Sequence, residues 1–189
     1  MKHWLKNLRQ NSIKLGAYLE DLHPDLARHF MGYASEVVEP HAVGMGLKLE
    51  EWSDERLSLR LPGRWRNRNA QGRISLGALG SATEVGLRLF WSRHLEAFGG
   101  QLQIQEMHLR WLPLAQYHHQ EDLLLKIEAR ALGVNELFLG TPESSSQAPL
   151  LWTLSWLNLR SQQVAEVEVQ ALIELLPALP PKPESDTSS

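Results

Sequence analysis

The sequence predicts an α+β domain in which an antiparallel sheet curls around one long helix. Its 189 residues are enough for one such domain with appendages. One long helical pattern, residues 74–95, is flanked by segments in which apolar and polar residues alternate, as they do in strands. Because one helix covers a sheet of this size only if the sheet bends around it, we expect a curled sheet.

The N-terminal part of the chain is predicted to be helical. Apolar residues recur at helical spacing over 3–33, and Pro24 divides them into two helices. The pattern then changes to strand-like alternation, and the chain ends in a segment rich in Pro and Ser. We therefore predict an N-terminal helical extension (1–35), a sheet domain (36–176) and a disordered tail (177–189).

Two strands are predicted ahead of the long helix, at 44–52 and 56–61. In the second, three leucines alternate with polar residues, which is the period of two of a half-buried strand. The dipeptide Pro62–Gly63 ends that strand, and a polar, basic loop, 64–73, then leads to the helix.

The helix predicted over 74–95 has two different faces, and Ser75 stands where it can cap the N-terminus. An apolar stripe at helical spacing should pack against the sheet. This stripe consists of Ala78, Ala82, Val85, Leu89 and Phe90. The opposite face has small and polar residues, namely Gly77, Gly80, Ser81, Glu84 and Arg88.

After the helix, alternation predicts strands at 101–112, 122–132 and 150–160, with a short strand at 135–140. Residues 164–176 alternate like a strand but have the Ala, Glu, Gln and Leu content of a helix, so both assignments stay open. The uncovered edges and outer face of such a sheet favour pairing with a second copy of the chain.

Composition excludes several classes of function. A net charge of -3 and a pI of about 6.2 give no general attraction to nucleic acid or to acidic membrane surfaces, so neither is an expected partner. No apolar run reaches the ~20 residues that a membrane-spanning helix needs. The lack of cysteine excludes disulfide scaffolds, thiol catalysis and thiolate metal sites, and it fits a cytoplasmic protein.

The segment 69–84 has the residue types of a site that binds a carbonyl group: one amide, a turn broken by glycine, and a helix start with small residues and one acid. Its spacing resembles that of the hotdog-fold acyl-CoA thioesterases of the phenylacetyl type and of their thioesterase-like relatives. Ser75 stands where those enzymes usually have His. The positions that match are Asn69, Gly72, Gly77, Ala78 and Glu84.

The resemblance implies a hotdog fold, with active sites at the interface of a homodimer or of a dimer of dimers. It implies hydrolysis of an acyl-CoA or acyl-carrier thioester, with neither a metal nor an organic cofactor. In such a site Glu84 would activate water, Asn69 would position it, and the N–H of Gly77 would stabilise the oxyanion. Gly72 and Ala78 would contribute to the substrate site.

Ser75 leaves a second interpretation open. A serine donates a hydrogen bond but does not titrate near neutral pH as a histidine does. Binding could survive this replacement while turnover is lost, so a non-catalytic hotdog protein that binds acyl-CoA or a fatty acyl chain is the main alternative. A scaffold protein that uses its N-terminal helices and Trp-rich surface is a third.

Each candidate residue also has a purely structural interpretation. Glu84 can pair with Arg88, four residues later on the same helix surface. Asn69 can be an ordinary turn residue, because asparagine is common in turns. Glycines in the helix can serve close packing against the sheet.

The basic loop and one histidine pair complete the candidates. Arginine binds phosphate in a forked geometry, so the loop is a candidate contact for the phosphates of CoA, while a solvated loop explains each arginine alone. These arginines are Arg64, Arg66, Arg68 and Arg73. His118 and His119, if in a strand, point to opposite faces, and no third ligand has suitable spacing, so no metal site is predicted.

Overall fold

The computed structural model describes residues 15, 18–19, 22–95, 100–112, 121–134 and 149–175. Six strands form one antiparallel sheet within this part of the chain. They are β1 (Lys48–Trp52), β2 (Arg56–Leu61), β3 (Gly100–Trp111), β4 (Leu123–Glu128), β5 (Leu150–Leu157) and β6 (Gln163–Leu175).

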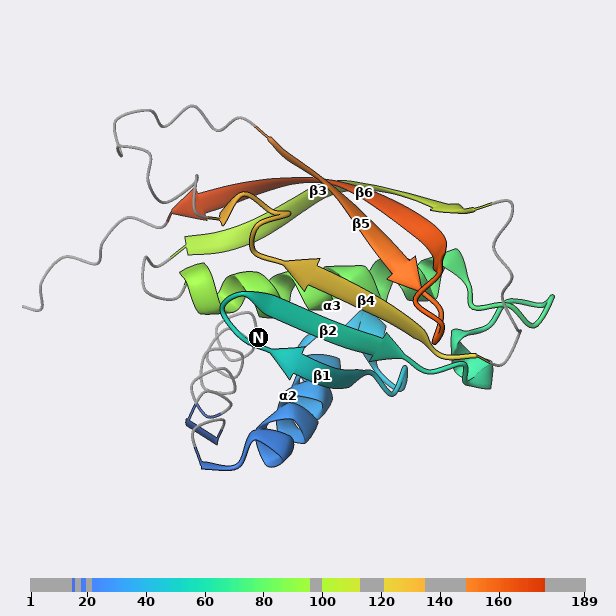
Figure 1. Ribbon diagram of the computed structural model, residues 1–189, viewed down its shortest axis with the longest axis horizontal. Coiled ribbons are helices and arrows are strands. Elements are labelled where there is room, and N and C mark those ends of the chain that lie inside the picture. The colour runs from blue at the N-terminus through green and yellow to red at the C-terminus, as the bar shows by residue number, and fades with distance from the viewer. Residues whose placement is uncertain are drawn as a thin grey trace, which may run out of the picture.

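The strands are ordered β1-β2-β4-β5-β6-β3 across the sheet. Figure 1 shows the sheet bending around the long helix α3 (Leu76–Leu95), with β3, β5 and β6 on one side of the helix and β1 and β2 on the other. The predicted architecture, a curled antiparallel sheet around one central helix, is confirmed.

Backbone pairing decides the segment that sequence patterns left open. Residues 163–175 form a strand, β6, because their backbone pairs with β3 on one side and with β5 on the other. A segment between two partners gains a hydrogen-bond ladder on each edge, which outweighs helix-favouring composition. The short strand predicted at 135–140 lies outside the described residues.

Turns shorten three of the predicted strands. β1 begins only at Lys48, because Gly44 and Gly46 take positive φ angles of 80° and 69° and turn the chain ahead of it. β4 ends at Glu128, where residues 129–133 form a turn. β5 ends at Leu157, before a turn in which Asn158 Oδ1 accepts the N–H of Arg160 and of Gln162.

Helix α3 lies at the centre of the hydrophobic core. Its predicted apolar stripe is buried, except that Ala78 is half-buried. Because the sheet curls, residues outside that stripe, such as Leu79 and Trp91, are buried as well. A Cβ atom at Gly86 would lie 3.1 Å from Cδ2 of Leu125, so glycine there allows the helix to approach the sheet closely.

A second helix, α2 (Pro24–Val38), packs against β1. Its Ala27 and Met31 are buried, and Arg28 Nη1 donates a hydrogen bond of 2.8 Å to the backbone oxygen of Glu50. The boundary predicted at residue 35 falls within this helix, and most of the first predicted helix lies outside the described residues. None of the described helices is long and apolar enough to cross a membrane.

A buried pair of hydrogen bonds joins α3 to β5. The indole N–H of Trp156 donates to Thr83 Oγ1 at 3.1 Å, and the Thr83 hydroxyl donates to the backbone oxygen of Leu79 at 2.8 Å. Thr83 and Trp156 have no exposed surface, so water does not compete for these bonds.

We predict that Thr83→Val lowers the free energy of unfolding by about 1–3 kcal/mol, because the buried indole N–H of Trp156 loses its acceptor at nearly constant side-chain shape. Urea unfolding followed by circular dichroism measures the change. In a Trp156→Phe background the same substitution should cost less, since no indole N–H is left without a partner. Equal costs in the two backgrounds would contradict this prediction.

Candidate functional site

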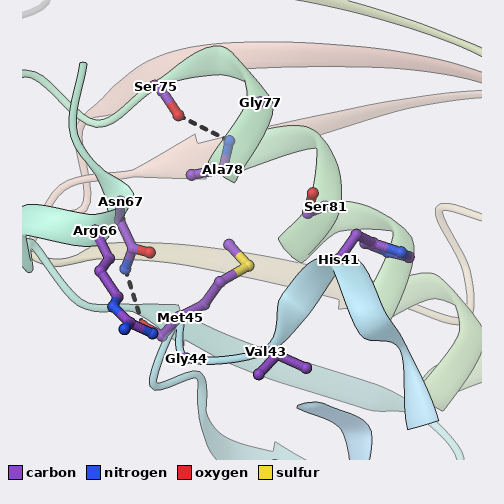
Figure 2. A pocket seen from close by; sticks show the side chains of 10 residues that line it. All are labelled: His41, Val43, Gly44, Met45, Arg66, Asn67, Ser75, Gly77, Ala78 and Ser81. Carbon is purple, nitrogen blue, oxygen red and sulfur yellow. Dashed lines mark hydrogen bonds between the residues drawn. The ribbon is translucent and has the colours of Figure 1, made fainter. Parts of the chain in front are cut away.

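A pocket of about 380 Å³ opens at the N-terminal turn of α3. Figure 2 shows its walls, which come from α3, from the 3-10 turn η1 (Pro40–Ala42) with the loop that follows it, and from the 3-10 turn η2 (Trp65–Asn67). The residues that line it are His41, Val43, Gly44, Met45, Arg66, Asn67, Ser75, Gly77, Ala78 and Ser81.

Two glycines shape the loop that follows η1, and one of them, Gly44, lines the pocket. Gly44 and Gly46 have positive φ angles, and the guanidinium groups of Arg66 and Arg64 lie directly against them. A side chain at either position would overlap an arginine. Because an arginine side chain is flexible and can shift, the positive φ angles are the main reason for glycine at both positions.

The amide that lines the pocket is Asn67 rather than the predicted Asn69. Asn67 is buried, and its Nδ2 donates to the backbone oxygens of Met45 at 2.9 Å and of Pro62 at 2.7 Å. Its own backbone oxygen accepts the N–H of Ser75 at 2.8 Å. Asn67 thus joins three segments around the pocket and directs its Oδ1, rather than Nδ2, to a possible ligand.

Asn69 has the structural role that turn propensity indicates. It is exposed, and its Oδ1 accepts the backbone N–H of Gln71 at 3.0 Å and of Arg73 at 3.1 Å. Gly72 has a φ of 77°, which this turn requires, and a Cβ there would meet no atom within 4 Å. Neither Asn69 nor Gly72 lines the pocket, and both set the direction in which the chain enters α3.

Ser75 caps α3, as its position predicts. Its Oγ accepts the backbone N–H of Ala78 at 3.0 Å, and its backbone oxygen accepts that of Leu79 at 3.1 Å. The N–H of Gly77, in the first turn, has no acceptor within the helix, and the helix dipole adds positive potential there. Gly77 lines the pocket, so this turn offers a hydrogen-bond donor to a ligand oxygen.

Glu84 lies two turns further along α3 and is half-buried, with 23% of its side chain exposed. Its Oε1 accepts two hydrogen bonds from Arg88, from Nε at 2.9 Å and from Nη2 at 2.7 Å, so the pairing expected from helical spacing is present. Its Oε2 lies 3.4 Å from Nε2 of His41. Glu84 does not itself line the pocket, but His41 does.

Three potential metal ligands lie close together around His41, at one end of the pocket. Ligand atoms of Glu39, His41 and Glu84 lie within 4.8 Å of one another, a spacing that one cation could bridge. Arg88 already supplies a positive charge there, since its Nε is 3.7 Å from Glu39 Oε1 and it also binds Glu84. The geometry is thus that of an ion-pair cluster. His118 and His119 lie outside the described residues.

The four arginines of the basic loop have different positions. Arg66 lines the pocket, and its Cζ lies 5.4 Å from the ring centroid of Trp65, which is 78% exposed. Arg68 donates to the backbone oxygen of Gly63. Arg64 packs on Gly46, as described above, and Arg73 is exposed. Arg66 is the one of the four whose side chain reaches the pocket.

Sequence reasoning missed Asn67 and His41. Asn67 lies two residues before Asn69 in the same polar loop, and the spacing of the resembling family favoured Asn69. His41 comes from a short turn that is 43 residues away from Glu84 in sequence (84 minus 41). The single signal for it was the pair Pro40–His41 between a helix and a strand, which does not by itself indicate a site.

No protein-family model and no curated protein matches the sequence. Solved structures do resemble the fold. A Pseudomonas aeruginosa protein of unknown function, described as a probable thioesterase, is 20% identical with a TM-score of 0.59, over 78% of this chain and 95% of the other. A mutant thioesterase from the same organism is 11% identical with a TM-score of 0.56, over 77% of this chain and 94% of the other.

A thioesterase from Haemophilus influenzae is 12% identical, with a TM-score of 0.51 over 70% of this chain and 80% of the other. At such low identities the likeness shows the fold alone, and the hotdog fold expected from the sequence is confirmed. What those proteins catalyse does not follow for this chain from the fold.

We predict that Ser75→Ala lowers the free energy of unfolding by about 1 kcal/mol, because the N–H of Ala78 loses its cap. Thermal or urea unfolding measures this loss. Ser75→Asn keeps a capping oxygen and should stay close to the wild-type value. Equal stability of the Ala and Asn variants would mean that the cap does not contribute.

Proposed function

We propose that this protein hydrolyses an acyl thioester, carried by coenzyme A or by an acyl-carrier protein. One observation supports it most strongly: a pocket at the N-terminal turn of α3 brings a backbone N–H, a serine hydroxyl and an amide together, and a carboxylate–imidazole pair lies at its end. The structural resemblance to thioesterases supports the same choice of reaction.

In the proposed reaction, water attacks the carbonyl carbon of the thioester, and the carbonyl oxygen becomes an oxyanion. The N–H of Gly77, at the positive end of the helix dipole, donates a hydrogen bond to that oxygen. The Ser75 hydroxyl, which accepts a bond as a cap, still has its own proton to donate. The Asn67 Oδ1 orients the attacking water, while Asn69 acts indirectly by holding the turn.

The carboxylate of Glu84 provides the negative charge that drives removal of a proton from water. The C–S bond then breaks, and the thiolate takes up a proton. The products are a carboxylic acid and a free thiol, and no cofactor takes part in this scheme.

The functional unit that we propose is a homodimer. β3, 12 residues long, forms one edge of the sheet, and its backbone groups on that edge can pair with a second strand. An isologous pair of such edges would continue the sheet across two copies.

We predict that the wild-type protein releases thiol from at least one member of a panel of short-chain, aromatic and long-chain acyl-CoAs. Glu84→Gln should lower kcat/KM by about 10²–10⁴-fold, because a neutral amide does not supply the negative charge that drives removal of a proton from water. A thiol-reactive dye measures the release. Glu50→Gln is a matched control, since Glu50, on β1, is a half-buried glutamate paired with Arg60 of β2.

Three results separate this proposal from the two other interpretations. Hydrolysis is supported if the wild-type protein shows turnover, the Glu84→Gln variant loses it and the Glu50→Gln variant retains it. No turnover, with a raised melting temperature in the presence of a non-hydrolysable thioether of acyl-CoA, supports a non-catalytic binding protein. Neither turnover nor a shift in melting temperature supports a scaffold.

We predict that Arg66→Gln raises KM for acyl-CoA by roughly tenfold, as expected when one charge-assisted hydrogen bond to a phosphate is lost. KM for a truncated thioester that lacks the nucleotide should not change. Steady-state kinetics with both substrates measures the difference, and Arg130→Gln, on an exposed turn away from the pocket, is the control. Equal effects on the two substrates would contradict a phosphate contact.

A further inference from the structure

We infer that His41 is the residue that exchanges the proton with water and with the leaving thiol, and that Glu84 positions its imidazole. This inference rests on the proposed hydrolysis and names a further residue for it. Nothing in the sequence spacing assigned a role to His41.

The first argument is access to the pocket. His41 lines the pocket, whereas Glu84 does not, and the two side chains meet at 3.4 Å between Nε2 and Oε2. Figure 2 shows His41 and Ser81 at one end of the pocket, with Arg66 and Asn67 at the other. The pocket is therefore lined by the residue whose imidazole contacts the carboxylate, and not by Glu84.

The second argument is the orientation of Glu84. Two N–H groups of Arg88 bind Oε1, which leaves Oε2 for His41. A hydrogen bond from His41 to Oε2 requires the imidazole proton on Nε2, so the lone pair lies on Nδ1. The carboxylate thus fixes the tautomer in which Nδ1 accepts a proton, as in the pairing of an acid with a catalytic histidine.

The third argument is the lack of a competing group among the lining residues. Ser75 stands where the resembling enzymes have a histidine, and its Oγ is engaged as the cap of α3. Of the ten residues that line the pocket, His41 alone has an imidazole, the side chain that enzymes use most often for general acid–base catalysis, and none of the ten is Asp, Glu, Cys or Lys. The pocket therefore has an imidazole, supplied by η1 rather than by the start of α3.

The steps balance without a further reactant. The oxygen of water bonds to the carbonyl carbon while Nδ1 of His41 takes one proton, and the carboxylate of Glu84 stabilises the imidazolium. The C–S bond then breaks, with its electron pair on sulfur. The imidazolium returns the proton to the thiolate, which gives the free thiol and regenerates the neutral imidazole.

Charged groups around the imidazole come from two elements in the described part of the chain. Glu84 and Arg88 belong to α3, and Glu39 lies just before η1. Together these three groups have two negative charges and one positive charge.

The test compares His41→Gln with wild type over pH 5–8, using the acyl-CoA that wild type hydrolyses best. We expect kcat to fall about 10²–10⁴-fold with little change in KM, and the rise of the rate with pH over this range to disappear, because glutamine does not titrate. His29→Gln is the matched control, since His29 is an exposed imidazole on α2 and does not line the pocket. Far-UV circular dichroism verifies that each variant folds. If His41→Gln does not fold, His41→Asn takes its place.

A double variant tests whether the two residues act in series. If Glu84 acts through His41, the His41→Gln/Glu84→Gln protein should be no slower than His41→Gln alone. If the two losses multiply instead, Glu84 acts on water directly and the inference is wrong.

The remaining outcomes separate this inference from the proposed function. If wild type hydrolyses thioesters and His41→Gln keeps its rate and pH profile, the inference fails while the function stands. An increase in KM at constant kcat would assign His41 to binding and would also overturn it. If wild type hydrolyses no thioester, the proposed function fails, and this inference fails with it.

Discussion

The enclosure of α3 by the curled sheet is the constraint on which the rest of the structure depends. Core residues surround the helix on most sides, Gly86 permits a close approach to β4, and the Thr83–Trp156 bond ties the helix to β5. The backbone N–H groups of a helix that lack a partner within the helix are those of its first turn. The pocket lies at this turn of α3, where the loops from η1 and η2 meet it.

Local turns decide which polar groups reach that pocket. Asn69 uses its side chain to hold the turn into α3, and Gly72 supplies the backbone conformation that the turn requires. Asn67, two residues earlier, is buried and bonds to two carbonyl groups of neighbouring segments. The same residue type therefore has a structural role at one position and a place in the pocket at the other.

An ion pair and a functional role are compatible at Glu84. Arg88 engages one carboxylate oxygen, which reduces the motion of the side chain, and the second oxygen faces His41. A carboxylate with one oxygen fixed is better placed to orient a neighbouring group than one that is free to rotate. The helical spacing of Glu84 and Arg88 thus explains the position of the acid without deciding what the acid does.

The sequence by itself determined the elements and their order, because apolar periodicity and turn residues act over short distances along the chain. The strand alternation, the central helix and the Ser75 cap were all predicted on that basis. Only the tertiary structure made residues 163–175 a strand, since the deciding hydrogen bonds come from β3 and β5. It also placed Asn67 rather than Asn69 in the pocket and brought His41 to Glu84, because contacts between distant segments depend on how the sheet closes around the helix.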